Sequence, residues 1–341
     1  MKVAIVHEML VKLWWAEKVV KTLSDIFPES PIYTLIYDEK KVWDVFEKNK
    51  VITTKSTQRI YNIFKNQRYC LPFMAKAVES IDLSKYDVVI VSSSWFAHWV
   101  IPKPQTKTII YYHSPARYLY DRTFEYIKEI GFDKWLKKII LSFLFHKLRI
   151  WDFIASSRWD ILIANSLNVK KRIRKYYKRD SLVIYPWVDI KRFQKEIKKA
   201  YPIPTTNYYI IISALSEFKK IDIAINAFNQ LDSSLVIVWD WNYKKELEEI
   251  VKNKKTKNIF FVWAKYGDEL VNLMQYSSWL IFPWEEDFWI VPIEALWAWK
   301  PVFAYYSWWL KETIKSWVTW DFFYNKDGSD FIKNFQIFEN D

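Results

Sequence analysis

Short apolar runs and amphipathic segments alternate along the chain. Buried strands are predicted at residues 3–7, 32–37, 88–92, 108–112, 161–164, 209–213, 235–238, 259–262 and 280–282. Helices are predicted between them, at residues 16–27, 169–178, 221–231, 244–252 and 268–276. Continuous apolar strands that alternate with helices are typical of parallel sheets covered by helices on both faces. The pattern therefore predicts an α/β fold.

The alternation stops once and then restarts. Three prolines punctuate the interval, at Pro186, Pro202 and Pro204. We therefore expect an N-terminal Rossmann-like domain at 1–186, a linker at 187–204 and a C-terminal Rossmann-like domain at 205–341. Ligands of such sheets bind at the carboxyl ends of the strands, so a site is expected in a cleft between two facing domains. The sequence ends soon after the apolar segment 331–338, and the C-terminal domain is expected to be truncated.

Charge and cysteine content narrow the class of protein. The chain of 341 residues has 51 Lys and Arg against 39 Asp and Glu, a net charge of +12. Such an excess suits nucleic acid, an anionic membrane, a phosphorylated substrate or simple solubility. No apolar run reaches the roughly 18 to 20 residues that span a bilayer, and no signal peptide is evident. Cys70 is the only cysteine, which excludes an internal disulfide and predicts a cytoplasmic location.

Glycine is nearly absent and tryptophan is abundant, with 3 and 21 residues respectively. A chain of this length has roughly 24 glycines at the average usage of about 7%, and the two counts together equal that number. Many tryptophans stand at turn-like positions, among them Trp14, Trp15, Trp239, Trp241, Trp297, Trp299, Trp308 and Trp309. There the chain needs a positive φ or a close backbone approach, which glycine alone permits without steric cost.

We hypothesise that the gene uses UGA as a glycine codon and was translated with a table that reads UGA as tryptophan. The alternative is a genuinely tryptophan-rich protein. Trp151 fits an apolar helix face and is expected to be authentic. Four further positions fit either interpretation: Trp43, Trp135, Trp159 and Trp279.

The segment 283–301 carries the clearest candidate chemistry. Glu286 and Glu294 flank seven residues, and carboxylates accept hydrogen bonds from the vicinal diols of sugars and ribose. A helix is predicted to begin near Val291 and Pro292, and its free N–H groups and positive dipole end suit phosphate. A group that binds diols beside one that binds phosphate indicates a nucleotide-sugar site. The Glu pair taken alone is equally typical of a solvated helix face.

With Trp284 and Trp289 read as glycine, the segment 283–301 resembles the signature of glycosyltransferase family 4. The resemblance covers nearly the whole chain and continues through residues 3–20, 112–118, 164–166, 185–189, 213–228 and 239–241. It implies the GT-B fold, with two Rossmann-like domains that face each other across a cleft. It also implies metal-independent, retaining sugar transfer from a nucleotide-diphosphate donor. Similarity to a branch associated with mannosyl transfer into bacterial surface polysaccharides suggests GDP-mannose.

The resemblance assigns donor contacts in the second half of the chain. Glu294 would hold the ribose hydroxyls, and Glu286 would contact the donor sugar as a catalytic residue. Lys219 would neutralise the diphosphate as charge develops on the leaving group. Backbone N–H groups near the sugar and phosphate would come from Phe288, Trp289 and Ile290.

In the first half, the resemblance places His113 near the reacting sugar as a catalytic candidate. Read as Gly-Gly, Trp14 and Trp15 would let the first helix approach the phosphates. The family has Ser-Arg-Leu where this chain has Ser-Ala-Leu at 213–215, so one phosphate-binding cation is missing. Two residues are candidates to replace it, Arg117 and Lys220.

His98 follows a predicted strand and is a candidate acceptor contact, with an ordinary structural role as the alternative. Residues 135–151 form a basic amphipathic segment. One interpretation is that this segment lies on an anionic membrane, with the protein peripheral on the inner face of the cell membrane. The other is a helix that packs against the core and has a solvated basic face. Basic stretches such as 170–178 are typical of solvated helix faces, so nucleic acid is not an expected partner.

The leading hypothesis is therefore a retaining transferase that moves a hexose to a polysaccharide or lipid-linked glycan. The alternative is a catalytically silent subunit that binds nucleotide sugar or serves as a scaffold.

Overall fold

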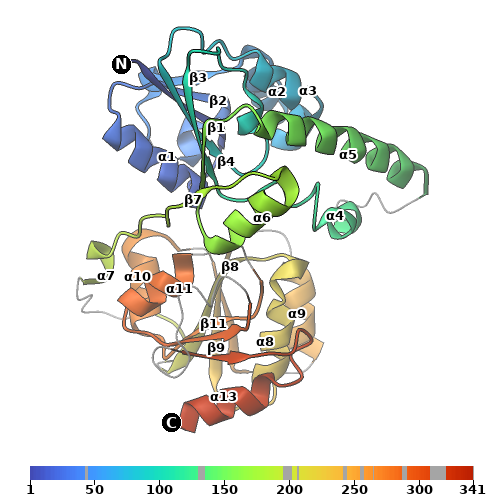
Figure 1. Ribbon diagram of the computed structural model, residues 1–341. Helices are drawn as coiled ribbons and strands as arrows, with labels where there is room; N and C mark the ends of the chain where they lie inside the picture. Colours follow the sequence, from blue (N-terminus) through green and yellow to red (C-terminus); the bar gives the residue numbers. More distant parts are fainter. Residues whose placement is uncertain are drawn as a thin grey trace. The chain divides into compact units, whose positions relative to one another are not determined.

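The computed structural model describes residues 1–42, 45–129, 135–194, 202–205, 207–240, 244–253, 257–263, 265–285, 290–307 and 320–340. The chain divides into two compact units, Met1–Pro186 (unit 1) and Trp187–Asp341 (unit 2). Each unit is an α/β domain built on one parallel sheet (Figure 1). The predicted class, two Rossmann-like α/β domains, is confirmed.

The sheet of unit 1 has seven strands in the order β3-β2-β1-β4-β5-β6-β7, and every neighbouring pair is parallel. Its strands are β1 (Val3–Leu10), β2 (Ile32–Tyr37), β3 (Val51–Thr53), β4 (Val88–Ser93), β5 (Lys107–Tyr112), β6 (Ile161–Ala164) and β7 (Leu182–Val183). Its helices are α1 (Trp15–Ile26), α2 (Lys55–Phe64), α3 (Leu71–Glu79), α4 (Thr123–Glu129), α5 (Trp135–Ser156) and α6 (Leu167–Tyr177).

The central strand β1 is buried on both faces. Ala4 and Val6 belong to a core cluster shared with α3 and α6, whereas Ile5 packs with Val20 of α1 on the other face. Because successive side chains of a strand point to opposite faces, burial on both faces requires the continuous apolar run seen in the sequence. The strand was predicted to end at His7, but it continues to Leu10.

The sheet of unit 2 has six parallel strands in the order β10-β9-β8-β11-β12-β13. They are β8 (Tyr208–Ala214), β9 (Ser234–Asp240), β10 (Ile259–Trp263), β11 (Leu280–Phe282), β12 (Val302–Tyr305) and β13 (Trp320–Phe323). The helices are α7 (Lys191–Gln194), α8 (Ile221–Phe228), α9 (Lys244–Asn253), α10 (Gly267–Gln275), α11 (Ile290–Trp297) and α13 (Phe331–Asn340).

Aromatic packing fixes α13 on the sheet of unit 2. The ring of Phe335 lies 4.9 Å from that of Tyr209 on β8 and 5.5 Å from that of Phe303 on β12. Phe331 lies 5.0 Å from Phe303, and both side chains are fully buried. The first strand of the unit and its last described helix therefore share one core. Within the described residues, no helix is long and apolar enough to cross a bilayer.

Candidate functional site

The strand order creates one topological switch point in each sheet. In unit 1, β2 lies on one side of β1 and β4 on the other, with β5 continuing beyond β4. In unit 2, β8 and β11 are the corresponding adjacent strands. Ligands of open α/β sheets bind outside the carboxyl ends of the strands at such points. Polar groups at the ends of these two strand pairs are therefore the candidates for a functional site.

A hydrogen-bonded array occupies the switch point of unit 1. His7 Nδ1 on β1 lies 3.1 Å from the carbonyl oxygen of Ser92 and 3.2 Å from its hydroxyl oxygen. The Ser92 hydroxyl on β4 lies 2.8 Å from Nε2 of His113, which follows β5. The predicted catalytic candidate His113 is therefore linked through Ser92 to His7. Sequence reasoning did not identify Ser92 as part of the site.

Glu8 anchors the loop that follows β4. Its Oε1 accepts hydrogen bonds from the Ser93 hydroxyl at 2.9 Å and from three backbone N–H groups, at distances of 2.7, 2.8 and 3.4 Å. Those N–H groups belong to Ser94, Trp95 and Ala97. Because hydrogen bonds to an ionised acceptor are roughly twice as strong as neutral ones, the buried carboxylate ties this loop firmly to β1.

His7 lies between two buried carboxylates. Its Nδ1 is 3.5 Å from Glu8, and its Nε2 is 4.0 Å from Glu17 on α1. Burial by itself lowers the pKa of His7, but the interaction with Glu17 and the charges of both carboxylates overcome this effect and raise it above 6.5. Burial and the nearby charge of His7 lower the pKa of His113 to about 3. The array thus favours a cationic His7 and a neutral His113.

His98 lies in the core of unit 1, with 1% of its surface exposed. Its Nε2 is 2.9 Å from Asp152 on α5, which also accepts hydrogen bonds from Trp99, Tyr120 and Tyr177. This environment is that of a residue buried inside the domain. A role for His98 as an acceptor contact stays a prediction.

The other candidates in unit 1 have local partners. Arg117 Nε lies 3.3 Å from Asp121, a carboxylate shared with Arg172. The backbone N–H of Trp14 donates to Glu17 at 2.9 Å, which caps α1. Trp14 has a φ of −106° in extended backbone, so of the two reasons given for glycine there, a positive φ does not apply. Lys18 Nζ lies 5.0 Å from the ring of Trp15.

At the switch point of unit 2, Lys219 meets the start of the 283–301 segment. Lys219 ends a short 3-10 helix after β8 and is 2% exposed. Its Nζ lies 4.9 Å from the ring of Phe218 and 4.8 Å from that of Trp284, which follows β11. The structure thus brings together two regions that the sequence assigned to the donor site. Lys220 adopts a φ of 49° and begins α8.

Glu294 is buried on α11, the helix that opens with the buried Ile290. Its Oε1 lies 3.9 Å from Nη1 of Arg192 on α7. Sequence reasoning missed Arg192, because nothing in the local pattern connects α7 with α11. Three other predicted donor residues lie outside the described part of the chain: Glu286, Phe288 and Trp289.

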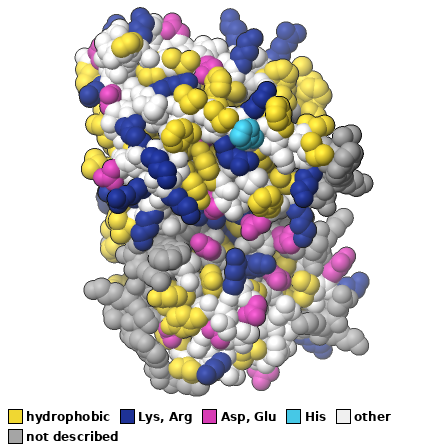
Figure 2. Space-filling model, turned by 45° about the vertical axis from the view of Figure 1, so that its right-hand side comes forward, with side chains coloured by type: hydrophobic (Ala, Val, Ile, Leu, Met, Phe, Trp, Pro, Cys, Tyr) yellow, Lys and Arg dark blue, Asp and Glu magenta, His cyan; other side chains and the backbone are white. Residues whose placement is uncertain are grey.

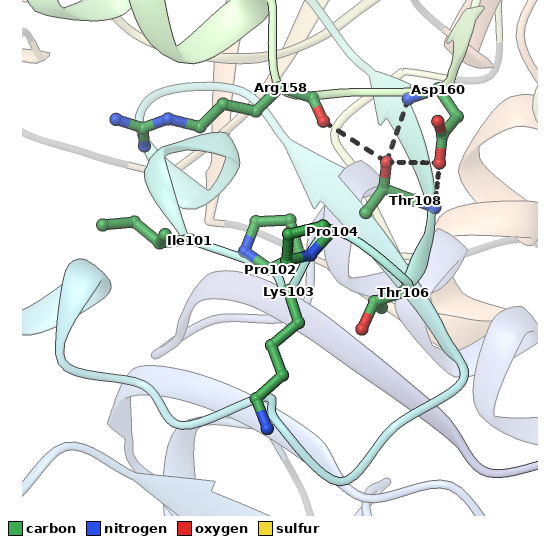
Figure 3. Close-up of a pocket in the computed structure, with 8 residues that line it drawn as sticks. All are labelled: Ile101, Pro102, Lys103, Pro104, Thr106, Thr108, Arg158 and Asp160. Atoms are coloured by element: carbon green, nitrogen blue, oxygen red, sulfur yellow. Dashed lines mark hydrogen bonds between the residues drawn. The ribbon is translucent and has the colours of Figure 1, made fainter.

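Figure 3 shows a surface hollow in unit 1. It lies near the start of β5, and His113 follows the other end of that strand. Thr108, near the start of β5, donates to Asp160, just before β6, at 3.0 Å. Other lining residues are Ile101, Pro102, Lys103, Pro104, Thr106 and Arg158. No predicted site residue lines this hollow, and it faces the amino ends of the strands. Among the described residues, no three His, Cys, Asp or Glu side chains are arranged to hold a metal ion.

Comparisons with known proteins agree with this architecture. The sequence profile described as Glycosyltransferase Family 4 matches residues 39–192, and that described as Glycosyl transferases group 1 matches residues 193–341. No curated protein sequence matches the chain.

Several solved structures share the fold. HepE from Anabaena in complex with UDP and glucose has a TM-score of 0.69 at 15% identity, covering 100% of this chain and 91% of that one. Sucrose-phosphate synthase from Thermosynechococcus elongatus has a TM-score of 0.70 at 14% identity, covering 99% and 90%. The lipopolysaccharide outer core galactosyltransferase WaaB has a TM-score of 0.60 at 12% identity, covering 98% and 89%. The two profiles, which together match residues 39–341, identify the chain as a family 4-like glycosyltransferase, and the likeness to these structures shows its GT-B fold.

Proposed function

We propose that the chain transfers a hexose from a nucleotide-diphosphate sugar to a polysaccharide or lipid-linked glycan, with retention of anomeric configuration. The observation that carries the proposal is the buried Lys219 beside Trp284, at the carboxyl ends of β8 and β11. An ammonium at this position suits the negative charge of a diphosphate. Glu294, buried on the helix that follows, suits the ribose hydroxyls.

The proposed chemistry needs no metal. The bond from the anomeric carbon to the phosphate oxygen breaks while the acceptor hydroxyl oxygen bonds to the same face of that carbon. The departing phosphate oxygen takes the acceptor proton. Lys219 stabilises the charge that develops on the diphosphate, and removing a group in this role costs about 10²- to 10³-fold in kcat. Glu286 contacts the donor sugar, and His113 orients it.

We propose mannose as the sugar and GDP-mannose as the donor. The support is the resemblance of the 283–301 segment to the mannosyl branch. Because HepE was crystallised with UDP and glucose, UDP-glucose is the natural competitor in a test.

The test is a donor panel with the full chain, comparing GDP-mannose, UDP-glucose and UDP-galactose on lipid-linked and free glycan acceptors. NMR of the product reports the anomeric configuration. Turnover with retention is expected, and it should be fastest with GDP-mannose. An inverted product would overturn the mechanism, and a faster reaction with UDP-glucose would overturn the donor assignment. Tight donor binding without transfer on any acceptor would favour the silent-subunit alternative.

We also propose that α5 docks on an anionic membrane. Large apolar side chains cover its outer face with 39 to 63% of their surface exposed: Ile139, Ile140, Phe143, Leu144, Ile150, Trp151, Phe153 and Ile154. The opposite face is buried through Phe145, Asp152 and Ala155. A helix that is apolar on both faces is normally covered on both. Lys147 lies on the exposed face, with its Nζ 4.7 Å from the ring of Phe143.

The positive charge of the protein indicates which kind of partner binds the exposed face of α5. Apolar and basic side chains intermingle in the upper part of Figure 2, and the chain carries a net charge of +12. Apolar side chains interspersed with cations suit the interface of an anionic bilayer, where a lipid-linked acceptor would lie.

Vesicle co-sedimentation tests this docking. The chain should bind phosphatidylglycerol-rich vesicles and not pure phosphatidylcholine. Phe143→Asp should abolish binding, whereas Phe64→Asp on α2, a comparably exposed phenylalanine, should leave it intact. Equal binding by both variants would contradict the proposal. A chain that ignores vesicles and forms dimers would indicate a second copy as the occupant.

We further propose that glycine belongs at Trp299. Two hydrogen bonds close the end of α11, from the N–H of Lys300 to the carbonyl of Ala295 and from the N–H of Trp299 to that of Leu296. This pair defines a Schellman motif whose left-handed residue is usually glycine. Trp299 occupies that position with a φ of 59° and 89% of its surface exposed. Among the described tryptophans, it alone has a positive φ.

Other tryptophans fit their surroundings. Trp99 and Trp159 are buried, and their indole N–H groups donate to Asp152 and to the carbonyl of His98. At these two positions, the burial and the hydrogen bonds of the indole rings give no structural reason to favour glycine. The coding DNA decides each position, since UGA at 299 supports the reassignment and UGG at most tryptophan positions would end it.

A further inference from the structure

Four side chains form a continuous path from α1 to the end of β5. Glu17 faces His7, His7 faces Ser92, and Ser92 bonds to His113. Glu8 flanks the path at 3.5 Å from His7. All these groups belong to unit 1, so the array is complete within one domain.

The acceptors around His7 determine where its protons lie. Ser92 offers two oxygens to Nδ1, and Glu17 faces Nε2. A neutral imidazole carries one proton and can donate from one nitrogen only, whereas an imidazolium donates from both. Glu8 and Glu17 supply the compensating negative charge, and the raised pKa of His7 agrees with this assignment.

The hydroxyl hydrogen of Ser92 can then point in only one direction. Its hydroxyl oxygen accepts from His7 Nδ1, so its own hydrogen points to His113 Nε2, 2.8 Å away. A neutral His113 that accepts at Nε2 must carry its proton on Nδ1. The lowered pKa of His113, about 3, agrees with a neutral ring.

Because Nε2 of His113 is bonded to Ser92, Nδ1 is the ring nitrogen that can bind a ligand. Among the described residues, no side chain or carbonyl bonds to this nitrogen, and the residue is partly exposed at the carboxyl end of β5. The backbone around it is fixed: its N–H donates to the carbonyl of Ser93 at 2.8 Å, and its carbonyl accepts from Asn165 at 3.0 Å.

We propose that His7 and Ser92 are positioning residues that fix His113 as a neutral imidazole, with its Nδ1–H directed at an oxygen of the donor sugar or its phosphate. The inference rests on the proposed transfer reaction and defines the part that His113 plays in it. His113 is a hydrogen-bond donor and does not abstract the acceptor proton, because Nε2 is occupied and Nδ1 already carries hydrogen. This division leaves deprotonation of the acceptor to the departing phosphate.

Nitrogen NMR of the full chain labelled with 15N-histidine tests the tautomer without any donor. The chain has four histidines, so single substitutions assign the signals. His113 should be a neutral Nδ1–H tautomer that does not titrate near its usual pKa of about 6.5. Ser92→Ala should give a mixture of tautomers, whereas Ser181→Ala, which removes another buried hydroxyl from unit 1, should change nothing. An Nε2–H tautomer, or titration near that pKa, would overturn the inference.

Kinetics give a second test. The amide nitrogen of Asn can replace Nδ1–H, whereas that of Gln reaches toward the Nε2 position. We expect His113→Asn to retain at least tenfold more kcat than His113→Gln, and Ser92→Ala to lose about tenfold, the effect of one hydrogen bond. Equal losses in Asn and Gln would contradict the inference. A confirmed tautomer in a chain that transfers no sugar would instead refute the proposed function, so the two failures are distinguishable.

Discussion

The two switch points hold their charges in different ways. In unit 1, the cation favoured at His7 lies between Glu8 and Glu17, and Glu8 binds the loop after β4 through backbone N–H groups. In unit 2, the ammonium of Lys219 lies against two aromatic rings, and the carboxylate of Glu294 is 3.9 Å from Arg192.

This difference indicates that the charged groups at the two switch points have different roles. Charges that a domain compensates internally are part of its folding, and removing one leaves its partners buried and unsatisfied. For Lys219, which lies against two aromatic rings at a strand end, we propose a different role, the binding of the donor diphosphate. We therefore expect substitutions in unit 1 to act first on stability and those in unit 2 to act first on turnover.

The largest effect should follow Glu8→Ala. Removing this carboxylate leaves the Ser93 hydroxyl and several N–H groups without their acceptor, and breaking a buried charge pair costs about 3–5 kcal/mol. Hydrogen exchange should show lost protection in β1 and β4 while unit 2 keeps its protection. Glu8→Gln, which preserves shape, should lose less. If hydrogen-exchange protection stayed normal and only kcat fell, the expectation that substitutions in unit 1 act first on stability would be contradicted.

Next in size is Lys219→Met, which keeps the aliphatic stem and removes the charge. We expect kcat to fall by about 10²- to 10³-fold with little change in the unfolding transition. Lys333→Met, at an exposed lysine on α13 of the same unit, is the control and should lose much less. If Lys219→Met mainly destabilised the protein, its ammonium would have a folding role and the comparison would fail.

Trp299→Gly should stabilise unit 2 by about 1–2 kcal/mol, because a residue with a Cβ is strained in the left-handed conformation. Trp299→Ala removes the indole but retains the Cβ, so it should gain less. Urea denaturation followed by circular dichroism measures both. An equal gain from Ala and Gly would show that the indole, and not the backbone, is the source of strain.

The smallest effect concerns pH. The raised pKa of His7 contributes stability that is present below its unfolded value of 6.5 and is lost as the pH rises through its folded pKa. His113 acts oppositely: its pKa is lowered, so stability falls as the pH drops from 6.5 to about 3. His7→Gln should flatten the alkaline side of a plot of urea midpoint against pH, and His113→Asn the acidic side. Unchanged profiles would contradict the assigned protonation states.

Much of the fold was predictable from apolar periodicity. The bounds of β2, β6 and β11 were predicted correctly. The end of β1 was not, because Glu8 interrupts the apolar pattern and is accommodated only by N–H groups from residues far along the chain. The strands β12 and β13 and the helices α2 and α3 were also missed. The two strands have four residues each, and their positions depend on contacts with the rest of their unit.

The positions of two candidate site residues were predictable from a motif, whereas their roles stay predictions. Lys219 and Glu294 lie at the switch point of unit 2 and on the helix that follows it, as the motif suggested. Glu17 stands within a resembling segment but was given no role, and Ser92 carried no signal beyond its place at a strand end. Their importance arises from distances between strands and helices, which spacing along the sequence does not encode.

The sharing of one core by β8 and α13 also affects synthesis on the ribosome. Every strand of unit 1 lies before Pro186, so its sheet and its histidine array can form while unit 2 is still being translated. The ring of Tyr209, near the start of unit 2, is not fully covered until Phe335 has been synthesised and packs against it. During that interval the nascent strand β8 exposes an apolar face. We expect chaperones that bind apolar segments of nascent chains to engage the emerging chain at this stage.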